Sequence, residues 1–122
     1  MEQAKKLVEL IDSKNFGILL DTFHMNIEEE SLQAAFETAG NLSFHIQVCE
    51  NNRGIPGKGQ LNWGQIKEEI KRIKYNKWVS VESFIPYDVK FSETMRFWRK
   101  LSPDQNLFAK ESFSFLNGLF SE

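Results

Sequence analysis

The chain has 122 residues, of which 41% are hydrophobic and 26% are charged, and these proportions are typical of one globular domain. Its formal net charge of −2 gives no electrostatic reason to expect nucleic acid or an anionic membrane as a partner. The single cysteine excludes an intramolecular disulfide, and no apolar run reaches the length of a membrane span. The first residues also lack the apolar stretch of a signal peptide. We therefore expect a cytoplasmic protein that binds neither nucleic acid nor membranes.

The spacing of apolar residues predicts helices and strands that alternate along the chain. A continuous apolar run predicts a buried strand over residues 18–21. Alternating apolar residues predict a second strand over 43–49, and a third strand is expected over 78–84. Helical periodicity predicts helices over 2–13, over 28–39 with Gly40 ending it, and over 62–74 with Asn62 as its N-cap. After a break at residues 85–87, a further helix is predicted over 91–101, and Pro103 and Asp104 start a last one. In the helix over 28–39, Glu28, Glu29 and Glu30 would form the first turn, where the helix dipole favours negative charge.

This order of elements predicts an α/β fold with a parallel sheet, because parallel strands are joined by right-handed helical crossovers. A complete (β/α)₈ TIM barrel needs roughly 250 residues, so three strand–helix units would make about half of one. We expect residues 1–122 to form a single partial barrel domain that ends in a C-terminal helix. Because half a barrel leaves strand edges unpaired, we also expect self-association through these edges, as a dimer.

Each predicted strand ends in polar residues, and parallel strands present these ends on the same side of the sheet. Asp21 ends the first strand, Gln47 lies near the end of the second, and Glu82 lies near the end of the third. Carboxylate and amide oxygens suit a hard or borderline cation such as Mg²⁺ or Mn²⁺. The spacing leaves a second interpretation of Asp21, as a carboxylate that caps a helix or fixes a loop. Glu82 is harder to explain in this way, since a carboxylate on a buried strand needs a partner.

Three spaced segments resemble a known superfamily: ILLDTFHMNIEE (residues 18–29), ENNRGIPGKG (50–59) and VESF (81–84). In this order they are similar to the C-terminal half of the sugar isomerase/epimerase superfamily. The most similar branch is the D-tagatose 3-epimerase (D-psicose 3-epimerase) group, which has a xylose isomerase-like TIM barrel. The resemblance extends over nearly the whole chain.

The resemblance implies a site for a divalent metal, Mn²⁺ or Mg²⁺, with Co²⁺ as a further candidate. Asp21, Gln47 and Glu82 would match three of the four metal ligands, and Glu82 would also act in catalysis as an acid or base. His24 and Arg53 would match residues that hold the sugar's oxygens. The glycines after Arg53 would let the loop turn and bring this arginine over the site.

Two departures from the family pattern concern the ligands. The epimerases usually have histidine at the position of Gln47, whereas the related hydroxypyruvate isomerases use glutamine there as a ligand. His45 lies one step deeper on the same strand face, where it would support the site from behind or be a satisfied core histidine. The fourth ligand, a glutamate from an earlier strand, has no counterpart in this sequence.

Two functions are therefore open. The first is a segment of a divalent-metal-dependent ketose 3-epimerase or sugar isomerase, which acts on a sugar or sugar phosphate by proton transfer through an enediolate. The alternative is a non-catalytic half-barrel that serves as a structural or assembly module. Because one catalytic glutamate is missing, we expect the isolated half to be poorly active or inactive. A barrel nuclease of the endonuclease IV type is excluded, since two histidines cannot build its histidine-rich zinc site.

Overall fold

The computed structural model describes residues 1–84, 88–96 and 98–121. Its elements are helix α1 (Glu2–Ile11), strand β1 (Ile18–Asp21), helices α2 (Thr22–Glu28) and α3 (Leu32–Ala39), the 3₁₀ turn η1 (Gly40–Leu42), strand β2 (Ser43–Val48), helix α4 (Trp63–Arg72), strand β3 (Val79–Val81), and helices α5 (Val89–Met95) and α6 (Gln105–Phe120). In the part of the chain covered by these ranges, no helix is long and apolar enough to cross a membrane.

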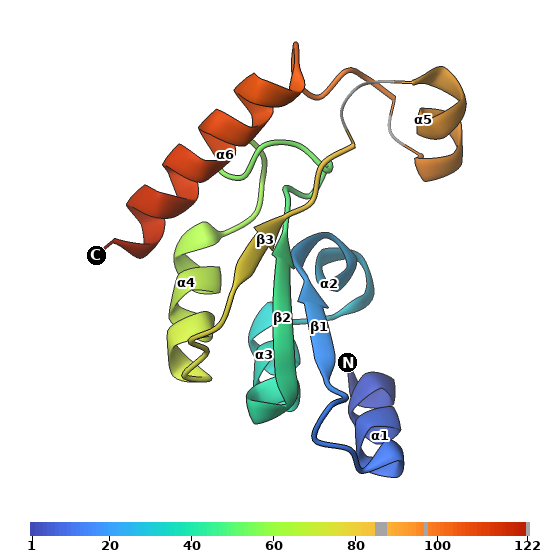
Figure 1. Cartoon of the computed structure of the whole chain (residues 1–122), viewed down its shortest axis with the longest axis vertical. Helices are drawn as coiled ribbons and strands as arrows, with labels where there is room; N and C mark the ends of the chain where they lie inside the picture. The colour runs from blue at the N-terminus through green and yellow to red at the C-terminus, as the bar shows by residue number, and fades with distance from the viewer. Residues whose placement is uncertain (85–87, 97, 122) are drawn as a thin grey trace.

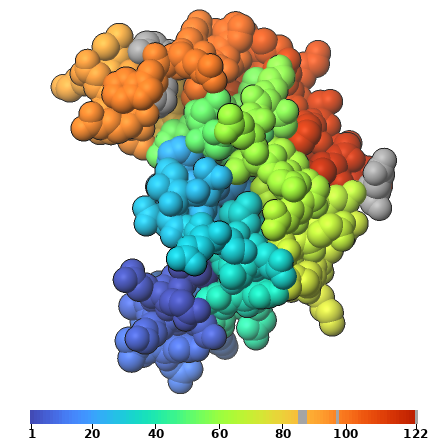
Figure 2. Space-filling model, turned by 180° about the vertical axis from the view of Figure 1, so that it is seen from behind, coloured from blue at the N-terminus to red at the C-terminus, as the bar shows by residue number. Residues whose placement is uncertain are grey.

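The three strands form one parallel sheet in the order β1–β2–β3. Figure 1 shows α2, α3 and α4 behind the sheet, whereas its front face carries no helix. Seen from the opposite side, α1 to α4 form a continuous layer (Figure 2). This arrangement is a partial α/β barrel, as predicted from the sequence, with the bare face where a closed barrel has its interior.

Residues alternate between the two faces of each strand, and this alternation separates core from site. On β2, Ile46 and Val48 are fully buried against the helices, whereas His45 and Gln47 point to the bare face. Leu19 on β1 also points to the bare face and is 52% exposed. The core between sheet and helices is made mainly of residues from β1, α3, β2 and α4, including Leu20, Phe36, Ile46 and Ile66.

The helix predicted over residues 28–39 is confirmed only over Leu32–Ala39, as α3, and its predicted first turn is wrong because Glu28 ends the separate helix α2. Asp21 caps α2 directly after the strand, and Ser31 caps α3 by accepting a 3.3 Å hydrogen bond from the backbone of Ala34. The acidic residues 28–30 therefore lie at the end of α2 and in the connection, not in a first turn. Glu29 instead accepts a hydrogen bond from the amino group of Met1.

Several other boundaries differ from the prediction. Strand β3 covers only residues 79–81, and α5 ends at Met95, followed by Arg96 as a C-cap with a left-handed backbone (φ 58°). Trp98 and Leu101, which were expected on this helix, follow it. Residues 85–87, predicted as a break after the third strand, lie outside the described residues. The predicted helix caps at Gly40, Asn62 and Asp104 are confirmed.

Candidate functional site

Asp21 uses its two carboxylate oxygens for two different tasks. Oδ1 accepts hydrogen bonds from the backbone N–H groups of Phe23 (2.9 Å) and His24 (3.2 Å), and so caps α2. Oδ2 accepts from the side-chain amide of Gln47 at 3.0 Å. The capping interpretation and the site interpretation are thus both compatible with the same buried side chain.

Gln47 lies at the centre of a cluster formed by the three strand ends. Its Nε2 donates to Asp21 Oδ2 and, at 2.9 Å, to Glu82 Oε1. Asp21 lies directly opposite Gln47 in the β1–β2 register. Glu82 follows β3 and is fixed by a 2.9 Å hydrogen bond from its backbone N–H to the carbonyl of Val48. The structure therefore brings together Asp21, Gln47 and Glu82, and we call them the strand-end cluster.

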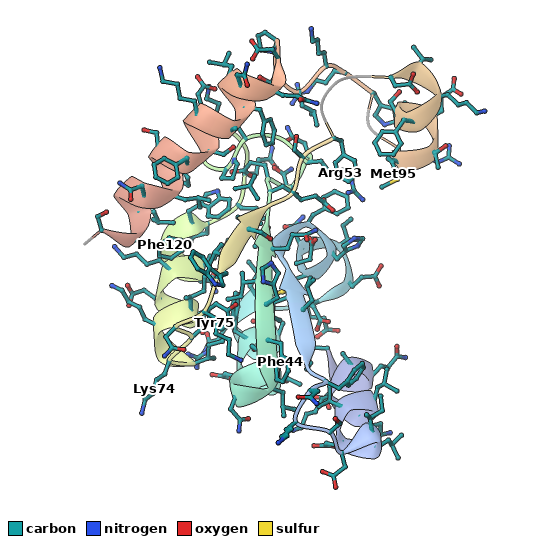
Figure 3. The ribbon with its side chains drawn as sticks, in the orientation of Figure 1. Phe44, Arg53, Lys74, Tyr75, Met95 and Phe120 are labelled. Atoms are coloured by element: carbon teal, nitrogen blue, oxygen red, sulfur yellow. The ribbon has the colours of Figure 1, made fainter. Side chains whose placement is uncertain are left out.

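Arg53 reaches the strand-end cluster from the glycine loop. Its Nη1 donates to Glu82 Oε2 at 3.0 Å. The guanidinium carbon lies 3.9 Å from the ring centre of Phe23 and 4.4 Å from that of Phe84, so the cation is held between two aromatic rings. Figure 3 shows Arg53 between the carboxyl ends of the strands and α5. The side chain is only 7% exposed, so its charge acts in a largely desolvated place.

The two histidines lie in different surroundings. His24 lines a hollow of about 420 Å³ on the bare side of the sheet, together with Asp21, Gln47 and Glu82. His45 lies two residues before Gln47 on the same strand face but does not line this hollow, and its Nε2 lies 2.6 Å from the hydroxyl of Ser80. The expected roles of His24 in sugar binding and of His45 in supporting the site remain predictions.

Glu50 is a residue whose importance the sequence reasoning missed. It lies two residues after the end of β2, is completely buried, and its side chain accepts four hydrogen bonds. Oε1 accepts from the backbone of Gly57 (2.8 Å) and the indole of Trp63 (2.5 Å), and Oε2 accepts from the backbones of Asn51 (3.2 Å) and Leu61 (3.3 Å). The signal in the sequence was the position of Glu50 at the start of the glycine loop, where a carboxylate can accept hydrogen bonds from the loop backbone.

The same anchor positions Arg53. The backbone N–H of Arg53 donates to the Glu50 carbonyl at 2.8 Å, and the Glu50 N–H donates to the carbonyl of Gly54 at 3.1 Å. This tight turn holds Arg53 in the left-handed region at φ 64°. The loop is thus a fixed structure around a buried carboxylate, rather than a segment that glycines merely let turn.

Cys49 is buried beside the cluster, and its thiol points to Glu82 Oε2 at 3.6 Å. Burial, followed by the negative charges of Glu82 and Asp21, raises the pKa of the Cys49 thiol far above its usual range. Its backbone exchanges two hydrogen bonds with the hydroxyl of Thr22. The thiol is therefore a packing group and not a nucleophile.

The strand-end cluster has the donor chemistry for a hard divalent cation. Two carboxylates face one small space, and a positively polarised amide group now bridges them. Among the described residues, no three His, Cys, Asp or Glu side chains gather at a potential metal site, so the third donor has to be the amide of Gln47. To bind a cation, the side-chain amide of Gln47 has to turn so that its oxygen, Oε1, takes the place of Nε2. Asp21, Gln47 and Glu82 then fit Mg²⁺ or Mn²⁺, and water or substrate oxygens would complete the coordination.

Residues 1–101 match the family described as xylose isomerase-like TIM barrel. The chain belongs to this family. Within the xylose isomerase-like family, it is 37% identical over 114 residues to a probable ketose 3-epimerase of Synechocystis sp., a match that covers 93% of this chain and 40% of the relative.

Two solved structures have the same fold over nearly the whole chain. An L-ribulose 3-epimerase superimposes with a TM-score of 0.87 at 30% identity, over 98% of this chain and 41% of that chain. A D-psicose 3-epimerase from Clostridium cellulolyticum H10, solved with D-tagatose, gives a TM-score of 0.83 at 33% identity, over 96% and 41%. The chain thus spans about two fifths of the length of these xylose isomerase-like relatives.

Proposed function

We propose that this chain contributes the metal-binding and catalytic strand ends of a ketose 3-epimerase or a related sugar isomerase. The observation that carries this proposal is the strand-end cluster, in which Asp21 and Glu82 lie on either side of Gln47. The chain's similarity to ketose 3-epimerases supports the same reaction class.

The residues of the cluster suit a proton transfer next to a carbonyl group. A bound divalent cation would supply Lewis-acid stabilisation of the negative charge that develops on the substrate oxygen. Glu82 would remove the proton from the carbon beside the carbonyl, which leaves an enediolate. Arg53 holds Glu82 through Oε2 and leaves Oε1 on the side of Gln47. His24, which lines the same hollow, would hold a substrate hydroxyl.

The alternative is a half-barrel that binds its partner but does not catalyse, and two observations favour it. Among the described residues, Glu82 is the one glutamate that bonds to Gln47, whereas epimerisation needs a second group to return the proton on the opposite face. In addition, an apolar hollow of about 670 Å³ lies between β3 and α6, lined by Val79, Val81, Phe108, Phe113 and Leu116 among others. This surface would bind a second copy of the chain.

Deuterium exchange separates these alternatives. A ketose is incubated with the chain and Mn²⁺ in D₂O, and the label at C3 is followed by NMR. An enzyme segment exchanges the C3 proton with a rate that Glu82→Gln abolishes and Glu30→Gln, an exposed control, leaves unchanged. Absence of exchange at every chain concentration, with metal bound, would leave the non-catalytic half-barrel as the function.

A further inference from the structure

A second hollow lies on the other side of Arg53 from the strand-end cluster. It has a volume of about 320 Å³ and lies where the glycine loop meets the segment after α5. Its described lining residues are Phe23, Asn51, Asn52, Arg53, Arg96, Trp98, Arg99 and Leu101. Three of these are arginines and none is acidic, although the whole chain is negatively charged. We call this space the arginine hollow.

The arginines of this hollow are not neutralised by the protein. In the part of the chain that the structure describes, no carboxylate lies within ion-pair distance of Arg96 or Arg99. Arg53 has one ion pair, to Glu82, and its buried Nε has no hydrogen-bond partner among the described residues. Three cations around one concave space, with unused donors, favour a ligand that brings negative charge.

Backbone turns position two of the arginines at the hollow. Arg96, at φ 58°, is the left-handed C-cap of α5, and Arg53, at φ 64°, lies in the turn that starts at Glu50. The side-chain oxygen of Asn52 accepts a 2.9 Å hydrogen bond from Gly54, which stabilises the turn that carries Arg53.

Phe23 and Arg53 form the wall between the two hollows. Phe23 donates its backbone N–H to Asp21, and Arg53 donates its Nη1 to Glu82, so each residue contacts the strand-end cluster and also lines the arginine hollow. A ligand that contacts Asp21 and Glu82 would therefore lie next to two residues that also line the arginine hollow. Trp98, which is 77% exposed, offers an apolar face beside them.

We propose that the arginine hollow is an anion subsite that binds the terminal phosphate of a phosphorylated ketose, while the reacting end of this ketose lies at the strand-end cluster. The guanidinium groups of Arg96 and Arg99 hold the phosphate by charge-assisted hydrogen bonds, and Arg53 adds a buried positive charge between the two sites. The identity of the ligand as a ketose rests on the function proposed above, whereas the anion subsite follows from the lining of the hollow.

The anion subsite is tested first by calorimetric titration of the metal-free chain with inorganic phosphate. We expect saturable binding, and we expect Arg96→Gln and Arg99→Gln each to weaken it about tenfold, since each variant removes one charge-assisted hydrogen-bond donor. Lys90→Gln, an exposed lysine of α5 outside the hollow, is the matched control and is expected to bind phosphate like the unchanged chain. Non-saturable binding, or an equal loss in the control, would overturn the subsite.

A second titration identifies the class of ligand. With Mn²⁺ present, D-fructose 6-phosphate is expected to bind at least about tenfold more tightly than D-fructose, and Arg99→Gln is expected to remove this difference. If acetate binds as tightly as inorganic phosphate, the subsite takes carboxylates and the phosphorylated ketose is wrong. If phosphate binds but neither sugar adds affinity with metal present, the subsite holds and the proposed function at the strand-end cluster fails. The two failures are therefore distinguishable.

Discussion

The carboxylate of Glu50 is predicted to be a major source of stability, and Glu50→Gln tests this with the smallest possible change of shape. Each of its oxygens accepts two N–H donors. In the variant, one oxygen becomes an NH₂ group, which faces two donors instead of accepting from them. The two bonds at the remaining oxygen lose their charge assistance.

The size of the effect follows from these four bonds. Two lost hydrogen bonds to a charged group, at roughly 1.5–3 kcal/mol each, set the scale, and the loop can relax partly, so we expect about 3 kcal/mol of lost unfolding free energy. For a chain of this length, that corresponds to a fall in Tm of about 10 °C. It is a large change for a domain whose total stability is of the order of 5–15 kcal/mol.

Urea unfolding, followed by tryptophan fluorescence, measures this loss. All variants are compared at one protein concentration, because association would change the apparent stability. The matched control is Glu111→Gln, which removes the 2.7 Å ion pair to Lys58 on the outside of the same loop. We expect this exposed pair to contribute no more than about 0.5 kcal/mol. A Glu50→Gln variant as stable as the control would refute the role of Glu50 as the anchor of the loop.

Three further predictions concern other parts of the chain. The thiol of Cys49, whose pKa is raised by burial, should resist iodoacetamide at pH 8 in the native protein and react fully in urea, and labelling of the native state would contradict its burial. Phe113→Glu, on the apolar hollow of β3 and α6, should shift the chain from dimer to monomer in sedimentation, whereas Val89→Glu on α5 should not; a wild-type monomer would contradict self-association. Asn62→Ala should lower the unfolding free energy by about 1 kcal/mol through the lost cap of α4, and an unchanged urea midpoint would contradict it.

Much of the fold could be predicted from the sequence because its strands and caps are local signals. A continuous apolar run identified β1, alternating apolar residues identified β2, and Gly40, Asn62 and Asp104 marked the helix boundaries where the structure has them. The error over residues 28–39 arose because acidic residues near a helix pattern were assigned to a first turn. Helix α2, which Asp21 caps, was not predicted. Asp21 is also the last residue of β1, so its role as a cap depends on where that strand ends.

The sequence predicted which residues form the site, but not which side chains contact one another. Alternation along the strands and the family resemblance brought Asp21, Gln47 and Glu82 to one place. Neither could reveal that the amide of Gln47 bridges the two carboxylates, or that two aromatic rings hold Arg53. Such contacts depend on side-chain conformations and on residues far apart in the chain, which no local pattern encodes.

The most direct test of the central claim is calorimetric titration of the chain with Mn²⁺. The account predicts one saturable site, which Asp21→Asn and Glu82→Gln each weaken at least about tenfold. Asparagine retains the capping ability of Asp21, so that variant keeps α2 while losing the charge. Glu30→Gln, an exposed carboxylate outside the strand-end cluster, should bind Mn²⁺ unchanged. Equal affinity in all four proteins, or no saturable binding in the unchanged chain, would contradict a metal site at the strand ends.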